Sequence, residues 1–425
     1  MSRFRRELDR LRTSGGGVRP SFSDQLRLLD PLPLAAGVVR EPRAQAKDRL
    51  PPGRVDETIH GCHYVIDSDY PETHFHGTVR LGRILPEDLR VLLELAGLTR
   101  TDCNRERIVF LDTETTGVHG GAGMCPFLIG IGYYSGDRFR IRQYFIRDFD
   151  EESSMLWALG GFLEEFDLIV TYNGRAFDVP LVENRCLLSR LDRPFDHMTH
   201  LDLLYMARRL WRASQGSCRL TALEERLVRF LRGPDIHGSK IPGAWFDFLR
   251  TGEAHFLGHV FSHNAYDILS LAALTIRAAD CLVQEPAPLD DPRDIYSLGR
   301  VFDREWARSR SIRYYEMALE SALPAKLRIR ALERLSVLYR RTGRPERSLD
   351  CCLRLIGESS FSLLGYERAA LCYEQGGNPE GACRILDEAI ARIRRTGGME
   401  RALARLEARR ARVGKKPSVP ALSDL

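Results

Sequence analysis

The chain has 425 residues, of which 28% are charged and 44% are hydrophobic. These figures exclude a collagen-like protein, a low-complexity chain and a small disulfide-stabilised domain. The length supports two or three folded units, each large enough to bury a core of its own. No apolar run approaches the roughly 20 residues that a membrane-spanning helix needs. The basic N-terminus lacks the apolar stretch of a secretory signal, so we expect a cytoplasmic protein with no membrane partner.

The positive charge comes almost entirely from arginine, because only five of the 63 basic residues are lysine. The planar guanidinium group suits phosphate. A GC-rich genome would produce the same composition, however, so charge alone does not choose between a nucleic-acid partner and codon bias. The ten cysteines are scattered without the paired spacing of a zinc site, and we expect them to be reduced and mostly buried.

The first 104 residues precede the segment with the clearest pattern. Residues 1–55 mix proline, glycine and arginine with isolated leucines, and we expect a loosely structured arm. Residues 56–104 form a predicted N-terminal extension. Short strands are expected up to residue 85, and a helix begins at Pro86, whose fixed φ and missing N–H suit the first helical position.

Residues 105–285 are predicted to form a compact α/β domain. The segments with strand composition are 108–116, 126–134, 138–146 and 167–173. The turn at Ser135-Gly136-Asp137 predicts that the first three strands form an antiparallel meander, to which the fourth strand returns. Helical spacing predicts helices over 153–166, 179–188, 201–211, 220–228 and 264–279.

Residues 292–412 are helical and contain an internal repeat. Tyr339 and Gly343 recur as Tyr373 and Gly377, with an offset of 34 residues in both cases. This offset is the period of tetratricopeptide helix pairs, which bind proteins or brace neighbouring domains. The alternative is an unrelated pair of helical hairpins. We therefore expect tetratricopeptide-like helical repeats with a protein partner, followed by a tail at residues 413–425.

The strongest chemical signal is Asp112-Thr113-Glu114, at the end of a predicted apolar strand. Side chains alternate between the two faces of a strand, so Asp112 and Glu114 share one face. Two carboxylates this close repel each other unless a cation lies between them, and hard oxygen ligands suit magnesium or manganese. Taken alone, the same pattern also arises where a strand ends at the solvent.

Two further segments carry acids that would meet the same edge of the sheet. Asp178 ends the run that starts at Asn173, just after a predicted strand, and would either join the other acids or cap the next helix. His263 and Asp267 lie where we expect the last helix of the domain to begin. They are four residues apart and so share one helix face, as an ordinary exposed pair would.

Together these segments resemble the DnaQ-like 3'-5' exonuclease superfamily, the DEDD group within the ribonuclease H-like fold. Its pattern is Asp-x-Glu on a strand, then Asn-x-x-x-Phe/Tyr-Asp, then a final Asp preceded by Tyr or His, and all four acids are present in this order. More narrowly, the runs LDTETTG, TYNGRAFDVPLVENR and DIHGSKIP resemble the YprB-type ribonuclease H-like branch. That branch is sometimes followed by tetratricopeptide-like helices.

The resemblance implies two Mg²⁺ or Mn²⁺ ions held by Asp112, Glu114, Asp178 and Asp267. Such ions supply a nucleophilic hydroxide and stabilise the leaving 3'-oxygen. In the family, the last acid is preceded by a histidine at five residues or a tyrosine at four, and this chain has His263 at the tyrosine position. We favour His263 as the group that orients or deprotonates the attacking water. The alternative is that it contacts substrate or lies on the helix surface.

Several other residues are weaker candidates for contact with substrate. Asn173 would touch the nucleic acid or simply form a turn before glycine, and Lys240 lies in the loop DIHGSKIP, where it would meet a phosphate. Asp202 would support the acids or only favour a helix N-terminus. Arginine-rich helices either follow a nucleic-acid backbone or present a solvated face, and this applies to Arg208, Arg209, Arg212 and Arg219.

The sequence thus predicts an α/β protein with a ribonuclease H-like mixed sheet flanked by helices, followed by an all-α repeat module. The expected function is that of a metal-dependent 3'-5' exonuclease acting on single-stranded DNA or RNA. The alternatives are a structure-selective endonuclease of the same fold and a non-catalytic scaffold that binds nucleic acid or protein.

Overall fold

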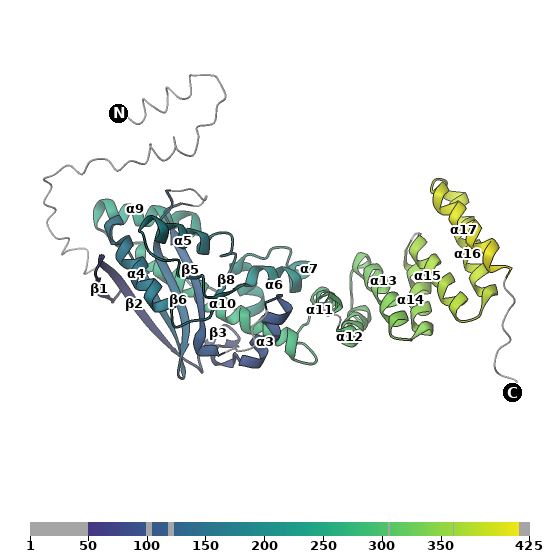
Figure 1. Ribbon diagram of the computed structural model, residues 1–425, viewed down its shortest axis with the longest axis horizontal. Helices are drawn as coiled ribbons and strands as arrows, with labels where there is room; N and C mark the ends of the chain where they lie inside the picture. Colours follow the sequence, from purple (N-terminus) through teal and green to yellow (C-terminus); the bar gives the residue numbers. More distant parts are fainter. Residues whose placement is uncertain (1–49, 99–103, 118–122, 305–306, 360, 416–425) are drawn as a thin grey trace, which may run out of the picture. The chain divides into compact units, whose positions relative to one another are not determined.

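The computed structural model describes residues 50–98, 104–117, 123–304, 307–359 and 361–415 (Figure 1). Most of the predicted N-terminal arm and most of the predicted C-terminal tail lie outside these ranges.

A seven-stranded mixed sheet forms the first part of the described chain, with the strand order β1-β2-β7-β6-β5-β8-β9. The predicted meander is confirmed, because β6 pairs antiparallel with both β5 and β7. The predicted fourth strand, β8, returns to the sheet parallel to β5. The strands are β1 (Arg54–Thr58), β2 (Gly61–Pro71), β5 (Ile108–Thr115), β6 (Pro126–Ser135), β7 (Arg138–Phe145), β8 (Leu168–Thr171) and β9 (Thr199–Asp202), and a separate ribbon joins β3 (Phe75–His76) to β4 (Val79–Arg80).

Helices flank this sheet on both faces. Tyr133 and Tyr134 are neighbours on β6 and therefore point to opposite faces. Tyr133 packs against Phe162 of α4, whereas Tyr134 belongs to the apolar core that also contains Ile268 of α10. The helices of this part are α3 (Pro86–Leu95), α4 (Glu152–Leu163), α5 (Asp178–Leu188), α6 (Leu203–Leu210), α7 (Arg212–Gln215), α8 (Leu220–Leu223), α9 (Ile241–Thr251) and α10 (Leu257–Val283).

Three predicted elements differ from the observed ones. The helix expected over 201–211 begins only at Leu203, because β9 continues through Asp202, whose carboxylate then accepts a hydrogen bond from the backbone N–H of Leu204. The helix expected over 220–228 is interrupted, since α8 passes into a π-helical turn at Glu224–Val228. The last helix of the domain begins at Leu257, earlier than residue 264.

The C-terminal part of the described chain is entirely helical. Neighbouring helices pack as the pairs α11–α12, α13–α14 and α15–α16. The turn inside the second pair contains Gly343 and the turn inside the third pair contains Gly377, at φ angles of 73° and 71°. A left-handed backbone of this kind favours glycine. The helices are α11 (Pro292–Arg304), α12 (Arg308–Glu320), α13 (Ala325–Arg341), α14 (Pro345–Glu358), α15 (Leu363–Gln375), α16 (Pro379–Thr396) and α17 (Glu400–Val413).

The apolar core is continuous between the sheet domain and the first C-terminal helices. Phe110 of β5, Trp211 beside α6, and Leu298 of α11 belong to one cluster of buried side chains. A second cluster, which includes Leu386 and Leu406, is formed by α14 to α17. Across the described residues, no helix combines the length and the apolar character required to cross a membrane.

Candidate active site

The end of β5 presents two carboxylates toward α10. Phe110, Asp112 and Glu114 alternate along the strand and so share a face, and Phe110 lies in the core beneath α10. The strand is fully buried from Ile108 to Leu111 and becomes half-buried at Asp112. The apolar half of β5 is therefore held in the core, while the two acids emerge at its edge.

Asn264 of α10 fixes the first of these acids. Its Nδ2 donates to the Asp112 carboxylate over 2.9 Å and to the Asp112 backbone oxygen over 3.2 Å. Gln143 of β7 in turn donates to Asn264 Oδ1 over 2.9 Å. Gly130 of β6 provides the space for this contact, since a Cβ there would lie 2.0 Å from Asn264 Oδ1. The fully buried Asn264 is thus held from two sides and aimed at Asp112.

Asp178 is the first residue of α5 and lies beside the middle of the Asp112-Thr113-Glu114 segment. The Thr113 hydroxyl donates to Asp178 Oδ1 over 2.5 Å. The capping alternative is excluded, because the N-cap of α5 is Phe177 and no side chain caps it. Asp178 therefore lies beside the segment that carries Asp112 and Glu114, and its carboxylate also accepts hydrogen bonds from its own backbone N–H and from that of Thr113.

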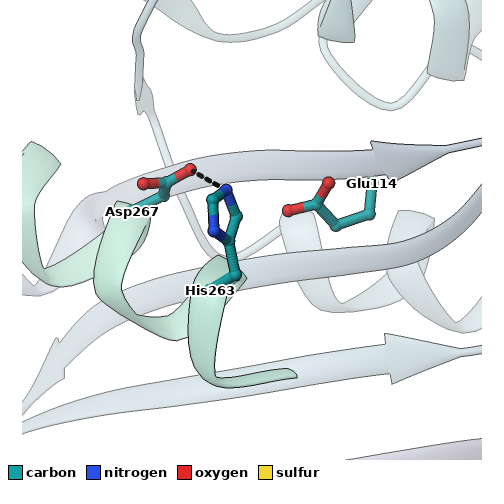
Figure 2. A group of neighbouring side chains, drawn as sticks. All are labelled: Glu114, His263 and Asp267. Atoms are coloured by element: carbon teal, nitrogen blue, oxygen red, sulfur yellow. Dashed lines mark ion pairs between the residues drawn. The ribbon is translucent and has the colours of Figure 1, made fainter. Parts of the chain in front are cut away.

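His263 and Asp267 project from successive turns of α10 toward Glu114 (Figure 2). His263 Nε2 lies 3.5 Å from Asp267 Oδ2, and ligand atoms of Glu114, His263 and Asp267 lie within 4.8 Å of one another. Both residues lie past the first turn of α10, since that helix begins at Leu257. Oxygen and imidazole donors at this spacing could hold a divalent metal ion.

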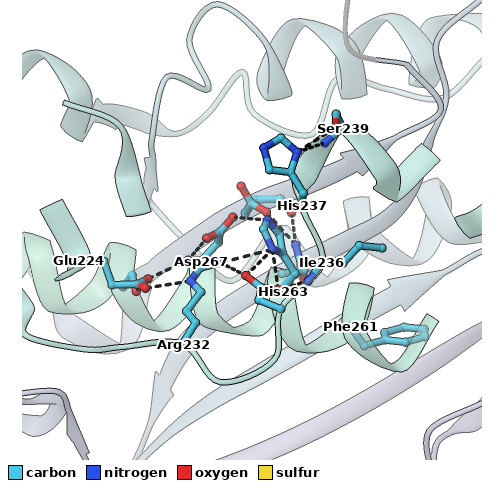
Figure 3. A network of polar contacts seen from close by, with 12 residues as sticks. Glu224, Arg232, Ile236, His237, Ser239, Phe261, His263 and Asp267 are labelled. Carbon is cyan, nitrogen blue, oxygen red and sulfur yellow. Dashed lines mark hydrogen bonds and ion pairs between the residues drawn. The ribbon is translucent and has the colours of Figure 1, made fainter. Parts of the chain in front are cut away.

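A polar network continues from this cluster to Arg232 (Figure 3). Arg232 donates to Asp267 and forms two hydrogen bonds of 2.7 Å and 2.8 Å with the buried Glu224. Asp235 lies between Arg232 and His263, at 3.2 Å from the guanidinium and 3.0 Å from His263 Nδ1. Because a carboxylate only accepts, His263 Nδ1–H donates to Asp235 and leaves Nε2 facing Asp267.

The acids raise one another's pKa in the absence of a cation. Burial, followed by the charges of Asp267, Glu114 and Asp178, raises the pKa of Asp112 well above its usual range. Burial and the charges of Asp267 and Asp178 do the same for the pKa of Glu114. Burial raises the pKa of Asp178 to about 6, although the hydrogen bond from Thr113 acts in the opposite direction. The charge of Arg232, which lowers the pKa of Glu114, does not outweigh burial and the neighbouring acids.

Two predicted substrate-binding residues lie outside this cluster. Asn173 adopts a positive φ of 69°, and its backbone N–H donates to the buried Asp202 over 2.8 Å, which is the geometry of a turn. Its side chain lines a neighbouring pocket. Lys240 is exposed at the end of the 3₁₀ turn Gly238–Lys240, and its ammonium group forms no ion pair with any described residue.

Sequence reasoning missed four residues that hold the site together. Asn264 lies inside the run HNAYD, and Asp235 is the first residue of DIHGSKIP, so both were part of recognised segments without an assigned role. Arg232 and Glu224 carried no local signal, because an arginine or a glutamate on an amphipathic segment usually faces solvent. Only their burial against α10 distinguishes them.

A match to a family model agrees with the architecture of the sheet domain. Residues 109–279 match the family model of the RNase_H superfamily. A family B DNA polymerase from the hyperthermophilic archaeon Pyrobaculum calidifontis is 16% identical with a TM-score of 0.33, and the match covers 49% of this chain and 30% of the polymerase chain.

The fold and the match to the family model together identify a nuclease domain of the ribonuclease H-like class. Proteins of this class typically use divalent metal ions to act on nucleic acid. The chain is also 31% identical over 288 residues to the uncharacterized protein YprB of Bacillus subtilis (strain 168), which covers 66% of this chain and 68% of YprB. The chain belongs to the family of YprB.

Proposed function

We propose that this protein is a metal-dependent 3'-5' exonuclease that hydrolyses phosphodiester bonds of single-stranded DNA or RNA. The observation that carries the proposal is the cluster of Asp112, Glu114, Asp178 and Asp267, whose charges raise the pKa of Asp112. Mutually repelling carboxylates at the edge of a ribonuclease H-like sheet are costly in the free protein. Two bound divalent cations would remove that cost.

The donor set fits such ions. Asp112, Glu114, Asp178 and Asp267 would hold two Mg²⁺ or Mn²⁺ ions, and four carboxylates balance the charge of two divalent cations. When bound, the ions supply a hydroxide nucleophile at neutral pH and stabilise the leaving 3'-oxygen.

The chain's own residues keep the carboxylates in place. Asn264 holds Asp112, and the Thr113 hydroxyl holds Asp178. Arg232 holds one oxygen of Asp267 and leaves the other oxygen facing His263. These contacts fix three of the four carboxylates before substrate binds, which is the preorganisation that catalysis requires.

His263 is the residue that we assign to proton transfer. Its Nδ1–H bond to Asp235 leaves the unprotonated Nε2 among the acids, where it would accept a proton from the attacking water. Asp235 would fix the ring orientation and stabilise the imidazolium that forms. Burial raises the pKa of Asp235, but the hydrogen bonds from His263 and Arg232 outweigh it and keep the pKa below its usual range.

Cleavage of end-labelled strands tests the proposed activity. Single-stranded DNA and RNA of one sequence are incubated with Mg²⁺, Mn²⁺ or chelator. We expect a metal-dependent ladder that shortens from the 3' end and disappears in Asp112→Asn, while Asp150→Asn, a change at an exposed acid of the same type, cleaves like the wild type.

Other outcomes would redirect the assignment. Metal-dependent cuts inside the strand would make the protein an endonuclease of the same fold. Cleavage that survives Asp112→Asn would remove the proposed site. If neither strand is cleaved under any of these conditions, the non-catalytic scaffold becomes the better description.

We also propose that α13 to α16 form tetratricopeptide-like repeats that bind a protein partner. The support is the 34-residue offset of Gly343 and Gly377, each of which closes the turn of a helix pair. A photo-crosslinking residue at the exposed Arg341 should capture a partner from cell extract, and the same residue at Asp150 should not. Equal capture at both positions would contradict the proposal.

A further inference from the structure

Six arginines surround one pocket where the nuclease domain meets the first C-terminal helices. The pocket has a volume of about 440 Å³ and lies between α6–α7 and the helices α11 and α13. Among the described residues that line it, none is acidic. The arginines are Arg208, Arg209, Arg212, Arg300, Arg304 and Arg330.

The charge of this pocket is not neutralised within the described part of the chain. Arg208, Arg212, Arg300, Arg304 and Arg330 are exposed, and their guanidinium groups form no ion pair with a described acid. Two other arginines of α13 are paired, Arg334 with Asp303 and Arg328 with Glu358.

A solvated helix face does not explain this arrangement. A solvated face spreads like charges along one helix, whereas these arginines converge from the four helices α6, α7, α11 and α13 on one concave surface. Converging like charges raise the energy of the free protein. The arrangement is therefore one that a polyanion would stabilise.

A second pocket extends this surface toward the segment that precedes Asp178. It has a volume of about 480 Å³, shares Arg208 and Arg212 with the first pocket, and adds Arg219. Its lining also includes Tyr172 and Asn173, which lie between the end of β8 and Asp178 at the start of α5. The basic surface is thus continuous from α11 to the segment that carries one of the four acids.

We propose that these two pockets, the arginine track, bind the phosphodiester backbone of the strand whose 3' end enters the acid cluster. This inference rests on the proposed nuclease function and names the path of its substrate. Guanidinium forks bind phosphate oxygens in pairs and are indifferent to the base, so the track holds the strand without reading its sequence. Asn173 lies at the end of the track, five residues before Asp178 in the sequence.

Binding of a labelled strand to a full-length, non-cleaving protein tests this inference independently of catalysis. In the Asp112→Asn background, Arg208, Arg212 and Arg300 are all changed to Gln, and anisotropy is measured over a range of salt concentrations with DNA and RNA. The matched control changes the exposed Arg341, Arg384 and Arg401 to Gln, with the same loss of charge. A third protein carries Lys at the three track positions, which keeps the charge and removes the forks.

Loss of three phosphate contacts should weaken binding of a strand of about 20 nucleotides roughly 10- to 100-fold near 0.1 M salt, and should reduce the salt slope by about 2. The Lys protein should recover part of the affinity, and the control should bind like the parent. A strand of about four nucleotides, which is too short to span the track, should lose less affinity than the long one. The nucleic acid that loses more affinity is the natural substrate class.

An equal loss of affinity for the strand in the track variant and in the control would overturn the inference, because such a loss would depend on net charge alone. Binding of polyglutamate but of neither nucleic acid through the same arginines would assign the pocket to an acidic protein partner and would also overturn it. The two proposals fail separately. If the wild type cleaves the strand but the track variant binds it as tightly as the parent does, only the arginine track is contradicted. If binding depends on the track but the wild type cleaves nothing, only the exonuclease proposal is contradicted.

Discussion

At the scale of single residues, the central problem of the site is how clustered carboxylates are tolerated before any cation arrives. Three of the four acids accept a hydrogen bond from a neutral or positive donor: Asp112 from Asn264, Asp178 from Thr113, and Asp267 from Arg232. Such bonds reduce the cost of burying charge but do not remove the repulsion, as the raised pKa of Asp112 indicates. The site is therefore electrostatically strained in its free form.

The raised pKa of Asp178 predicts that a neutral residue at this position stabilises the protein. The pKa of Asp178 rises from its ordinary 3.8 to about 6, so between these values the folded protein binds more protons than the unfolded chain. The free energy of unfolding should then fall as the pH rises through this window and stay lower above it. Without metal at pH 7.5, Asp178→Asn should be about 1–3 kcal/mol more stable than the wild type, a difference that vanishes toward pH 4.

Thermal unfolding in chelator at several pH values measures this difference. Added Mn²⁺ should stabilise the wild type more than the variant, because it binds the folded state through the acids. A variant that is less stable than the wild type at pH 7.5 in chelator would contradict the electrostatic account.

The hydrogen bond between Asp235 and His263 predicts a kinetic effect. Asp235→Asn should lower kcat by about tenfold or more with little change in KM, because the imidazole loses its fixed orientation and its counter-charge. His263→Ala should lower the rate further. Steady-state cleavage over pH 5–9 measures both effects, and a wild-type profile in both variants would place His263 on the helix surface.

At the scale of elements, the site depends on how closely α10 approaches the sheet. Asn264 and Asp267 both belong to α10. Of the two, Asn264 is the one whose side chain contacts β6 and β7. The approach is possible because Gly130 has no side chain at the crossing. The spacing between one strand and one helix therefore sets the position of Asp112 relative to Asp267.

Gly130→Ala should disturb this contact. A Cβ at 2.0 Å from Asn264 Oδ1 must displace the amide, and we expect a loss of about 1–3 kcal/mol in stability together with most of the activity. Gly258→Ala is the matched control, since nothing lies within 4 Å of its Cβ position in α10, and it should be neutral or stabilising by up to about 1 kcal/mol.

A double variant separates the expected loss of stability from the expected loss of activity. In Gly130→Ala with Asn264→Ala, the clash is removed, so the unfolding temperature should partly recover while activity stays low. Full activity in Gly130→Ala alone would show that Asn264 does not position Asp112. Differential scanning calorimetry and the end-label assay provide the two readouts.

At the scale of the whole molecule, the packing of the described chain divides within the helical region. The first core joins the sheet domain to α11, α12, α13 and one side of α14, and the second core is formed by the other side of α14 together with α15 to α17. The first C-terminal helices are consequently part of the structure that supports the nuclease, and the arginine track lies at this junction. The later helices depend mainly on their neighbours in the chain, as repeat arrays do.

Core substitutions in the two clusters should therefore act differently. Leu298 and Leu386 are both fully buried, and changing either to Ala should cost about 2–5 kcal/mol locally. Hydrogen exchange should show loosening of α6 and α10 as well as α11 in Leu298→Ala, whereas Leu386→Ala should loosen only α14 to α17. Faster exchange across the sheet in Leu386→Ala would show that the described chain unfolds as one cooperative unit.

Much of this architecture was predictable from the sequence. Strand composition and turn residues identified the meander and β8, and the positions of Asp112 and Glu114 on one strand face followed from alternation. His263 and Asp267 share a helix face because they are four residues apart, which is about one helical turn. These properties depend on neighbours within a few residues, which is the range over which backbone geometry is regular.

Tertiary structure alone decided the contacts that turn these residues into a site. Asn264 meets Asp112 across 152 residues, and Arg232 meets Asp267 across 35. The arginine track likewise combines α6, α11 and α13. No local pattern encodes such contacts, because they arise from the register of strands and the packing of helices over the whole core. The sequence determined which elements form and which acids they carry, and tertiary packing determined what those acids face.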